Sequence, residues 1–253
     1  MERLTLAVCP HDTASNPERW FLFTQYLNQR LQGVRVGFEP VDGFADFRDL
    51  MLRADLVYAN PQDSHVLCTE HGFQPLARPS NLFDEVVIIA DPELGEVSLR
   101  DIAGQMVASV PTMLPTCQAL ARLSDAAGVR PAAIRACDSW LGVMNAVRRG
   151  RTPYGFVYRD YFDGLGMMSQ RMVRVVEKTD TRSIQHTFVI GGSQGRLYRR
   201  GIAALLSSMH EDGQGRERLQ ALSMACLESV DEAALERIAT VQAHCERVAV
   251  LSA

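Results

Sequence analysis

The sequence has no uninterrupted apolar run of about 18 residues, so it predicts no transmembrane helix and no direct insertion into a membrane. It also has no long basic stretch, and its formal net charge of -4 gives no support for nucleic-acid binding. The opening residues MERLTLAVCP lead straight into an apolar strand and lack the cleavage site of a signal peptide. As it stands, the chain is expected in the cytoplasm, or in the periplasm if it is a trimmed mature form.

The cysteines form no CxxC pair and follow no regular spacing. This pattern predicts neither a structural zinc site nor a disulfide framework, and we expect no metal and no cofactor. Most of the thiols should behave as small buried apolar groups, and their abundance favours a reducing compartment. The six are Cys9, Cys68, Cys117, Cys137, Cys226 and Cys245.

Short apolar runs alternate with amphipathic stretches along most of the 253 residues. Strands are predicted at 4–9, 34–41, 55–59, 84–91, 105–111, 133–137, 154–158, 172–178 and 186–192. Helices are predicted at 17–31, 44–54, 64–72, 116–127, 141–150, 196–210, 214–226 and 231–248. This alternation indicates an α/β protein with parallel sheets covered by helices. The length and the number of strands favour two doubly wound lobes over one sheet.

Ligands of open parallel sheets bind beyond the carboxyl ends of the strands, so the residues there are the candidates for a site. After the first strand, His11 stands next to Asp12, and three roles stay open: catalysis, ligand contact, or turn and cap chemistry. After the third strand comes Asn60-Pro61, which signals a turn. Tyr58, just before it, is either a core aromatic or a wall of the pocket.

The stretch PTCQ, Pro115 to Gln118, opens the helix predicted at 116–127. A helix start offers up to four free N–H groups and a positive dipole end, both of which suit a small anion. Thr116 could cap this helix and present its hydroxyl, and the dipole should favour the thiolate form of Cys117. The alternative is a plain N-cap. We include Pro115, Thr116, Cys117 and Gln118 among the predicted ligand-binding residues.

Two further strand ends carry candidates in the second half of the chain. Ser139 has the position of an ordinary N-cap, and Trp140 beside it is either a pocket wall or a core side chain. Tyr158 ends another strand. Arg159 follows it and could clamp an anion, or pair with a nearby aspartate on the surface.

Four stretches in order resemble the phosphate/phosphonate-type substrate-binding proteins of ABC transporters, which have the type II periplasmic-binding fold. They begin ERWFLFTQYLNQRL, DEVVIIADPELGEV, SWLGVMNAVRRG and LQALSMACLESV, and the resemblance runs from about residue 3 to 242. It implies that residues 1–89 and 185–253 form lobe 1 and residues 90–184 form lobe 2. Two crossover strands, near 86–92 and 180–188, would join the lobes, and the ligand would be held in the cleft by lobe closure.

The sequence departs from this family at three places. PTCQ keeps one hydroxyl of the family's serine- and threonine-rich anion loop, and Ser139-Trp140-Leu141 lacks the carboxylate that would meet an amino group. Phe83 stands where some members have a pocket tyrosine. These changes argue against an aminoalkylphosphonate and favour a small anion with an apolar or aromatic part, or an oxyanion with affinity for the Cys117 thiol.

The resemblance therefore implies a solute-binding protein, not an enzyme, that captures a small anion for transport or sensing. Its expected partners are that anion and an ABC transporter permease or a signalling protein. One alternative is a cytoplasmic enzyme on the same fold, because LTLAVCPHDT resembles the SPCPNDT loop of enzymes in the futalosine route to menaquinone. Another is a module that binds a protein partner instead of a small molecule.

Overall fold

The computed structural model describes residues 2–13, 16–41, 43–230 and 232–252, and the chain divides into two compact units. Unit 1 comprises Met1–Phe83 and Gln185–Leu235, and unit 2 comprises Asp84–Ile184 and Glu236–Ala253. Neither unit is continuous in sequence. In the part of the chain that the structure describes, no helix combines the length and the apolarity needed to cross a bilayer.

Unit 1 is built on a six-stranded sheet with the order β11-β4-β10-β3-β1-β2. Its strands are β1 (Glu2–Val8), β2 (Val34–Phe38), β3 (Leu56–Ala59), β4 (Gln74–Pro79), β10 (Thr187–Ile190) and β11 (Leu227–Glu228). β1, β2 and β3 are parallel, whereas β10 runs antiparallel to both β3 and β4. The start of β10 therefore lies at the same edge as the carboxyl ends of β1 and β3.

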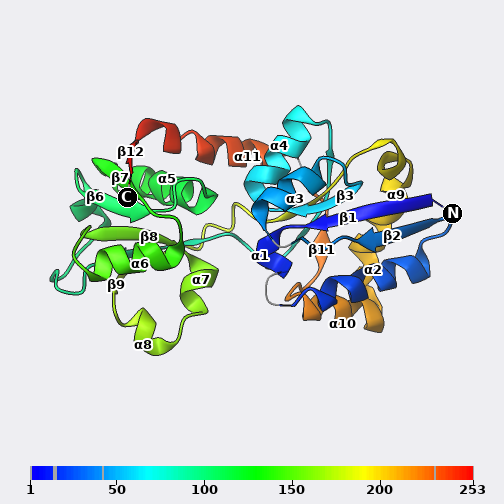
Figure 1. The fold of residues 1–253 in the computed structure, drawn as a ribbon, viewed down its shortest axis with the longest axis horizontal. Helices are drawn as coiled ribbons and strands as arrows, with labels where there is room; N and C mark the ends of the chain where they lie inside the picture. Colours follow the sequence, from blue (N-terminus) through cyan, green and yellow to red (C-terminus); the bar gives the residue numbers. More distant parts are fainter. Residues whose placement is uncertain (1, 14–15, 42, 231, 253) are drawn as a thin grey trace. The chain divides into compact units, whose positions relative to one another are not determined.

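Helices cover both faces of this sheet (Figure 1). They are α1 (Pro10–Thr13), α2 (Glu18–Arg30), α3 (Phe44–Met51), α4 (Pro61–Glu70), α9 (Ser193–Ser208), the 3-10 turn Met209–Glu211 and α10 (Gly213–Ala221). The predicted stripe of α2 is confirmed, because Trp20, Phe23 and Leu27 are fully buried against β1 and β10. α3 and α4 bury Phe47 and Leu67 against the opposite face.

Unit 2 is built on a second six-stranded sheet with the order β12-β7-β6-β8-β5-β9. Its strands are β5 (Val86–Ala90), β6 (Met106–Ser109), β7 (Ala133–Ala136), β8 (Tyr154–Tyr158), β9 (Arg174–Lys178) and β12 (Ala249–Leu251). β12, β7, β6 and β8 are parallel, and β5 runs antiparallel to β8 and β9. Residues just before β5 therefore lie at the same edge as residues just after β8.

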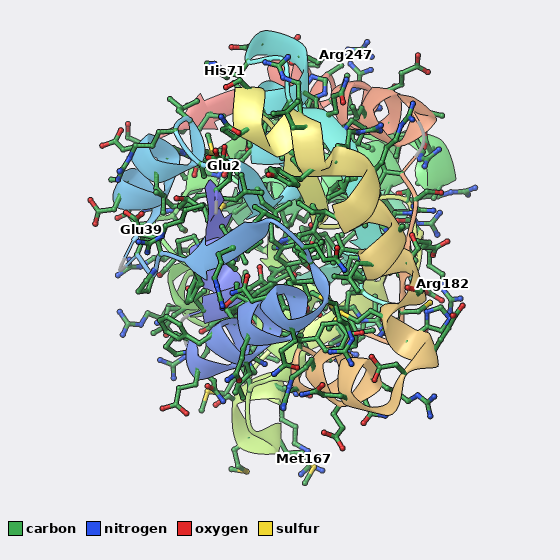
Figure 2. All side chains as sticks on the ribbon, turned by 90° about the vertical axis from the view of Figure 1, so that its right-hand side faces the viewer. Glu2, Glu39, His71, Met167, Arg182 and Arg247 are labelled. Carbon is green, nitrogen blue, oxygen red and sulfur yellow. A yellow bond between two sulfur atoms is a disulfide. The ribbon has the colours of Figure 1, made fainter. Side chains whose placement is uncertain are left out.

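The helices of unit 2 also cover two faces of their sheet. They are the 3-10 turn Leu99–Ile102, α5 (Leu114–Ala127), α6 (Trp140–Arg148), α7 (Arg159–Asp163), α8 (Met167–Gln170) and the 3-10 turn Cys245–Arg247. α5 packs on one face and α6 on the other, and α11 (Glu232–Gln242) contains the boundary between the units. Charged side chains such as Glu39, Arg182 and Arg247 lie on the outside (Figure 2).

The predicted α/β class is confirmed, but the prediction of parallel sheets is wrong, because β4, β5, β9, β10 and β11 make antiparallel pairs. Three strands were not predicted. β4 contains two prolines, which argue against a strand within a sheet, and β11 has only two residues. β12 follows the helix predicted at 231–248, which ends earlier, at Gln242.

The units differ from the predicted lobes at two places. β5 lies wholly in the sheet of unit 2, whereas the prediction placed residues up to 89 in lobe 1. The prediction also placed the whole C-terminal segment in lobe 1, but residues 236–253 belong to unit 2. The physical reasons are that β12 extends the second sheet by pairing with β7 and that Cys245 is bonded to Cys117.

Candidate functional site

In unit 1, three polar side chains gather at the edge where β1 and β3 end and β10 begins. The antiparallel pairing places Thr187 opposite Ala59, so His186 and Asn60 flank the same end of the sheet. Cys9 follows β1 there, and the Asn60 amide lies 3.8 Å from the Cys9 Sγ. This edge is the place where an α/β sheet of this kind binds ligands.

The turn after β1 is held by backbone hydrogen bonds. The Cys9 N–H donates to the Tyr58 carbonyl at 2.9 Å, and the Asp12 N–H donates to the Cys9 carbonyl at 2.9 Å. The Asp12 carbonyl accepts from the Trp20 indole at 3.2 Å and from the Arg19 guanidinium at 3.1 Å. These four bonds fix the position from which the Asp12 side chain projects.

The Asp12 carboxylate meets His186, with Oδ2 and Nδ1 separated by 2.9 Å. The two side chains are 26% and 11% exposed, so the pair is reached from solvent mainly at the carboxylate. The side chain of the predicted residue His11 lies outside the described part of the structure. Tyr58 is 1% exposed and packs against Trp20 and the His186 ring, which makes it a core aromatic of this edge.

Asn60 is the N-cap of α4, and Pro61 is its first residue, so the predicted turn at Asn60-Pro61 is the start of a helix that begins three residues earlier than predicted. Its Oδ1 accepts from the Asp63 N–H at 2.9 Å, and its Nδ2 donates to the Asp63 carboxylate at 2.5 Å. Burial raises the pKa of Asp63, and the hydrogen bond from Asn60 offsets part of that rise.

In unit 2, the start of α5 differs from the prediction. The helix begins at Leu114 with Met113 as N-cap, so Thr116 is not the cap. Thr116 is fully buried, and its hydroxyl donates to the Val110 carbonyl at 2.6 Å and lies 2.7 Å from the Ser109 hydroxyl. The predicted role of Thr116 as an N-cap that presents its hydroxyl is therefore wrong.

The amide groups of this turn are also engaged within the chain. The Met113 N–H donates to Val110 and the Thr116 N–H donates back to Met113, both at 3.0 Å. Pro115 has no N–H to offer. The two-residue shift of the helix start thus explains why the expected row of amides is not available to an anion at these positions.

Because the Thr116 hydroxyl bonds inward, we expect Thr116→Val to lower the free energy of unfolding by about 1–2 kcal/mol. Affinity for a bound anion should not change. Urea unfolding and calorimetry measure the two effects, and Thr112→Val on the same loop is the control, because Thr112 is exposed. Weakened binding with unchanged stability would instead show that the Thr116 hydroxyl reaches the ligand.

Cys117 forms a disulfide with Cys245, with their Cα atoms 4.9 Å apart. The expected thiolate at the start of α5 is therefore wrong, and so is the expectation that no disulfide is present. Sequence spacing could not suggest the pair because 128 residues separate the two cysteines. Next to it, Gln118 is 3% exposed and donates to the Asp84 carbonyl at 2.7 Å, so it ties α5 to the chain before β5.

Ser139 caps α6, as predicted, by accepting from the Gly142 N–H at 3.1 Å. Trp140 is 9% exposed and packs in the core between α6 and the sheet, with its ring 6.4 Å from that of Tyr158. The Tyr158 hydroxyl lies 2.9 Å from the Asp84 carboxylate and 3.2 Å from that of Asp160. The rings of Trp140 and Tyr158 and the carboxylates of Asp84 and Asp160 therefore lie together at the carboxyl end of β8.

Arg159 is engaged within unit 2, and it makes the aspartate pairing that the sequence offered as the alternative to an anion clamp. Its Nη1 donates to the Thr179 carbonyl at 2.8 Å, and its Nε lies 3.4 Å from the Asp163 carboxylate. Burial acts to raise the pKa of Asp163, but hydrogen bonds from Lys178 and Arg159 hold that pKa below its usual range.

Phe83, the remaining predicted site residue, is half-buried as the last residue of its segment in unit 1.

Sequence reasoning missed His186, Asp84 and Asp160. The first two stand just before strands that run antiparallel to their neighbours, so a search for residues after parallel strands could not find them. The alternation of charge and aromatic residues in YRDYF was the available signal for Asp160. Whether any of the predicted residues touches a ligand stays a prediction.

A family model described as "ABC transporter, phosphonate, periplasmic substrate-binding protein" matches residues 6–235. No curated protein matches the sequence. Among solved structures, XAC2383 from Xanthomonas citri bound to chloride ion is 16% identical, with a TM-score of 0.73 and coverage of 97% of this chain and 98% of that chain. PhnD1 from Prochlorococcus marinus in complex with methylphosphonate is 13% identical, with a TM-score of 0.72 and coverage of 98% and 99%.

The periplasmic aliphatic sulphonate binding protein SsuA from Escherichia coli is 14% identical, with a TM-score of 0.63 and coverage of 96% of this chain and 79% of that chain. At these identities the similarity establishes the fold. The predicted fold, that of the type II periplasmic binding proteins, is confirmed.

Proposed function

The chain belongs to the family of phosphonate-type periplasmic substrate-binding proteins of ABC transporters, and on this premise we propose that it captures a phosphonate, a sulfonate or a related small oxyanion. The observation that carries the proposal is the family match over residues 6–235. The members of this family bind substrates and do not transform them, in agreement with the predicted role. The alternative of a menaquinone-route enzyme finds no support in this match.

The polar groups of unit 2 favour Ser139 as the oxyanion donor. Thr116 and Arg159 direct their donors at partners within the unit, whereas Ser139 is exposed at the carboxyl end of β7. Its oxygen accepts from Gly142, so its own hydroxyl hydrogen can donate to a bound oxyanion. We therefore propose Ser139 as the anchor of the charged group, with the α6 amides beside it.

The half-buried ring of Tyr158 favours a ligand with an apolar part, whereas Trp140 lies in the core. Trp140 follows Ser139 in the chain, and its ring lies 6.4 Å from that of Tyr158. The thiol-seeking oxyanion is no longer proposed, because Cys117 Sγ is bonded to Cys245. Asp160 is exposed 3.2 Å from the Tyr158 hydroxyl, so an amino group on the ligand would also find a carboxylate here.

A melting and calorimetry panel tests the proposal with methylphosphonate, phenylphosphonate, 2-aminoethylphosphonate, methanesulfonate and phosphate. A true ligand at one hundred times its Kd should stabilise the protein by about 2.7 kcal/mol. Ser139→Ala should weaken its binding by about 1–2 kcal/mol, because one hydrogen bond to a charged group is lost.

Ser98→Ala is the matched control for this variant. Ser98 also caps a helical turn of unit 2, but it stands between β5 and β6, away from the carboxyl end of β8. Equal affinities in the two serine variants would remove Ser139 from the site. No stabilisation by any anion would contradict the proposed function and favour the protein-binding alternative.

We propose the periplasm as the compartment and an ABC transporter permease as the partner, both from the family. The Cys117–Cys245 bond supports an oxidising compartment, whereas the predicted reducing one rested on free thiols. A signalling protein as partner stays a prediction, and so does closure of two lobes on the ligand.

A further inference from the structure

Cys9, Asp12 and His186 bring a thiol, a carboxylate and an imidazole together at the strand-end edge of unit 1. One ligand atom from each lies within 4.8 Å of the others. We propose that these three residues form a binding site for a borderline transition-metal ion, with Zn²⁺ as the expected occupant. Sulfur, nitrogen and oxygen in one set suit this ion, and three protein ligands leave a fourth position open.

The spacing of these atoms fits a site that tightens around an ion. Bond lengths of about 2.0–2.3 Å to zinc place the ligand atoms of a tetrahedral site roughly 3.5 Å apart. The Asp12 and His186 atoms, 2.9 Å apart, would open by about 0.6 Å, and atoms as far as 4.8 Å apart would close by about 1 Å, which side-chain rotation alone can supply. The exposed portions of Asp12 and His186 give the ion its path from solvent.

The surroundings of the three residues also suit a metal site. The Asp12 backbone is fixed by hydrogen bonds from Trp20 and Arg19, and the His186 ring packs against Tyr58. The Asn60 amide 3.8 Å from the Cys9 sulfur can donate to a thiolate. Such outer-shell contacts orient metal ligands and strengthen their hold on the ion.

Metal binding here requires the thiolate of Cys9 and an unprotonated ring nitrogen on His186, so the ion displaces the thiol proton into solvent. No sequence pattern indicates this site, because Asp12 and His186 are 174 residues apart and meet only through the antiparallel pairing of β10. The inference does not rest on the proposed function.

The test uses the full chain without an affinity tag, under argon and without reductant, so that the Cys117–Cys245 disulfide stays intact. Equilibrium dialysis against Zn²⁺ should give one tightly held ion per chain. Co²⁺ in its place should give a near-ultraviolet thiolate-to-cobalt charge-transfer band. No phosphonate or sulfonate is present, so failure here is distinguishable from failure of the anion assay.

Loss of an outer-shell partner alone costs roughly tenfold in metal affinity. Each of the three ligand variants, Cys9→Ser, Asp12→Asn and His186→Gln, should therefore weaken Zn²⁺ binding at least tenfold. Cys9→Ser should also abolish the charge-transfer band. Cys68→Ser and His65→Gln, which change the same residue types on α4, should leave both readouts unchanged. Cys9 is buried, so the Cys9→Ser variant could fail to fold. In that case the variants at Asp12 and His186, which are partly exposed, still decide the result.

Absence of stoichiometric zinc in the wild type would overturn the proposal. So would stoichiometric zinc that all three site variants retain with unchanged affinity.

Discussion

Replacing both Cys117 and Cys245 with alanine is expected to lower the free energy of unfolding of unit 2 by about 4 kcal/mol. The disulfide closes a loop of 128 residues, and restricting so long a loop in the unfolded chain removes much of its conformational entropy. The double substitution leaves no lone thiol at the site. Denaturant unfolding of the oxidised proteins measures the effect, and a reductant should bring the wild type to the level of the variant.

Cys68→Ser provides the control in unit 1. Cys68 forms no disulfide, and burial raises the pKa of its thiol to about 11. Thiol titration of the unreduced, unfolded wild type should find the four free cysteines alone. Six reactive thiols, or a double variant as stable as the wild type, would contradict the assignment.

Glu85→Ala is expected to lower the free energy of unfolding by about 3 kcal/mol, because it removes a buried charged acceptor shared by three donors, of which the Thr179 hydroxyl is itself buried. The Glu85 carboxylate is in a side chain only 3% exposed. It accepts from the Arg182 N–H at 2.7 Å, from the Thr181 hydroxyl at 3.1 Å and from the Thr179 hydroxyl. These bonds hold residues 179–182 against the start of β5.

Two further variants make the Glu85 measurement specific. Glu96→Ala removes an exposed carboxylate from the same unit and should change stability by less than about 0.5 kcal/mol. Glu85→Gln keeps one acceptor oxygen and should fall between the wild type and Glu85→Ala. Equal unfolding midpoints for Glu85→Ala and Glu96→Ala would rule out a supporting role for this carboxylate.

The elements that the sequence predicts well are those whose own residues carry the signal. The stripe of Trp20, Phe23 and Leu27 requires a helix with one buried face wherever it packs, and the run YGFVY forms β8 at the predicted residues. β4 and β12 are strands because neighbouring strands pair with them, and their own sequences give little sign of it. The direction of β5 and β10 is likewise decided by the sheet.

The candidate site shows the same distinction between features that local sequence indicates and features that distant partners decide. The sequence predicts strand ends near residues 9 and 136–158 where the structure has them, but it does not show what each side chain there faces. Whether Thr116 points outward depends on whether α5 begins at residue 114 or 116, and a two-residue difference turned the hydroxyl into the core. Cys117 and His186 are defined by partners far away in sequence, which no local pattern reveals.

The outer position of β12 in the second sheet has a consequence for synthesis on the ribosome. Until residues 249–251 emerge, β7 is the edge of that sheet, with one side of its backbone unpaired. An unpaired edge invites association with other chains. The nascent protein thus carries an unpaired edge strand until residues 249–251 have left the ribosome, and a chain truncated before residue 249 would keep it.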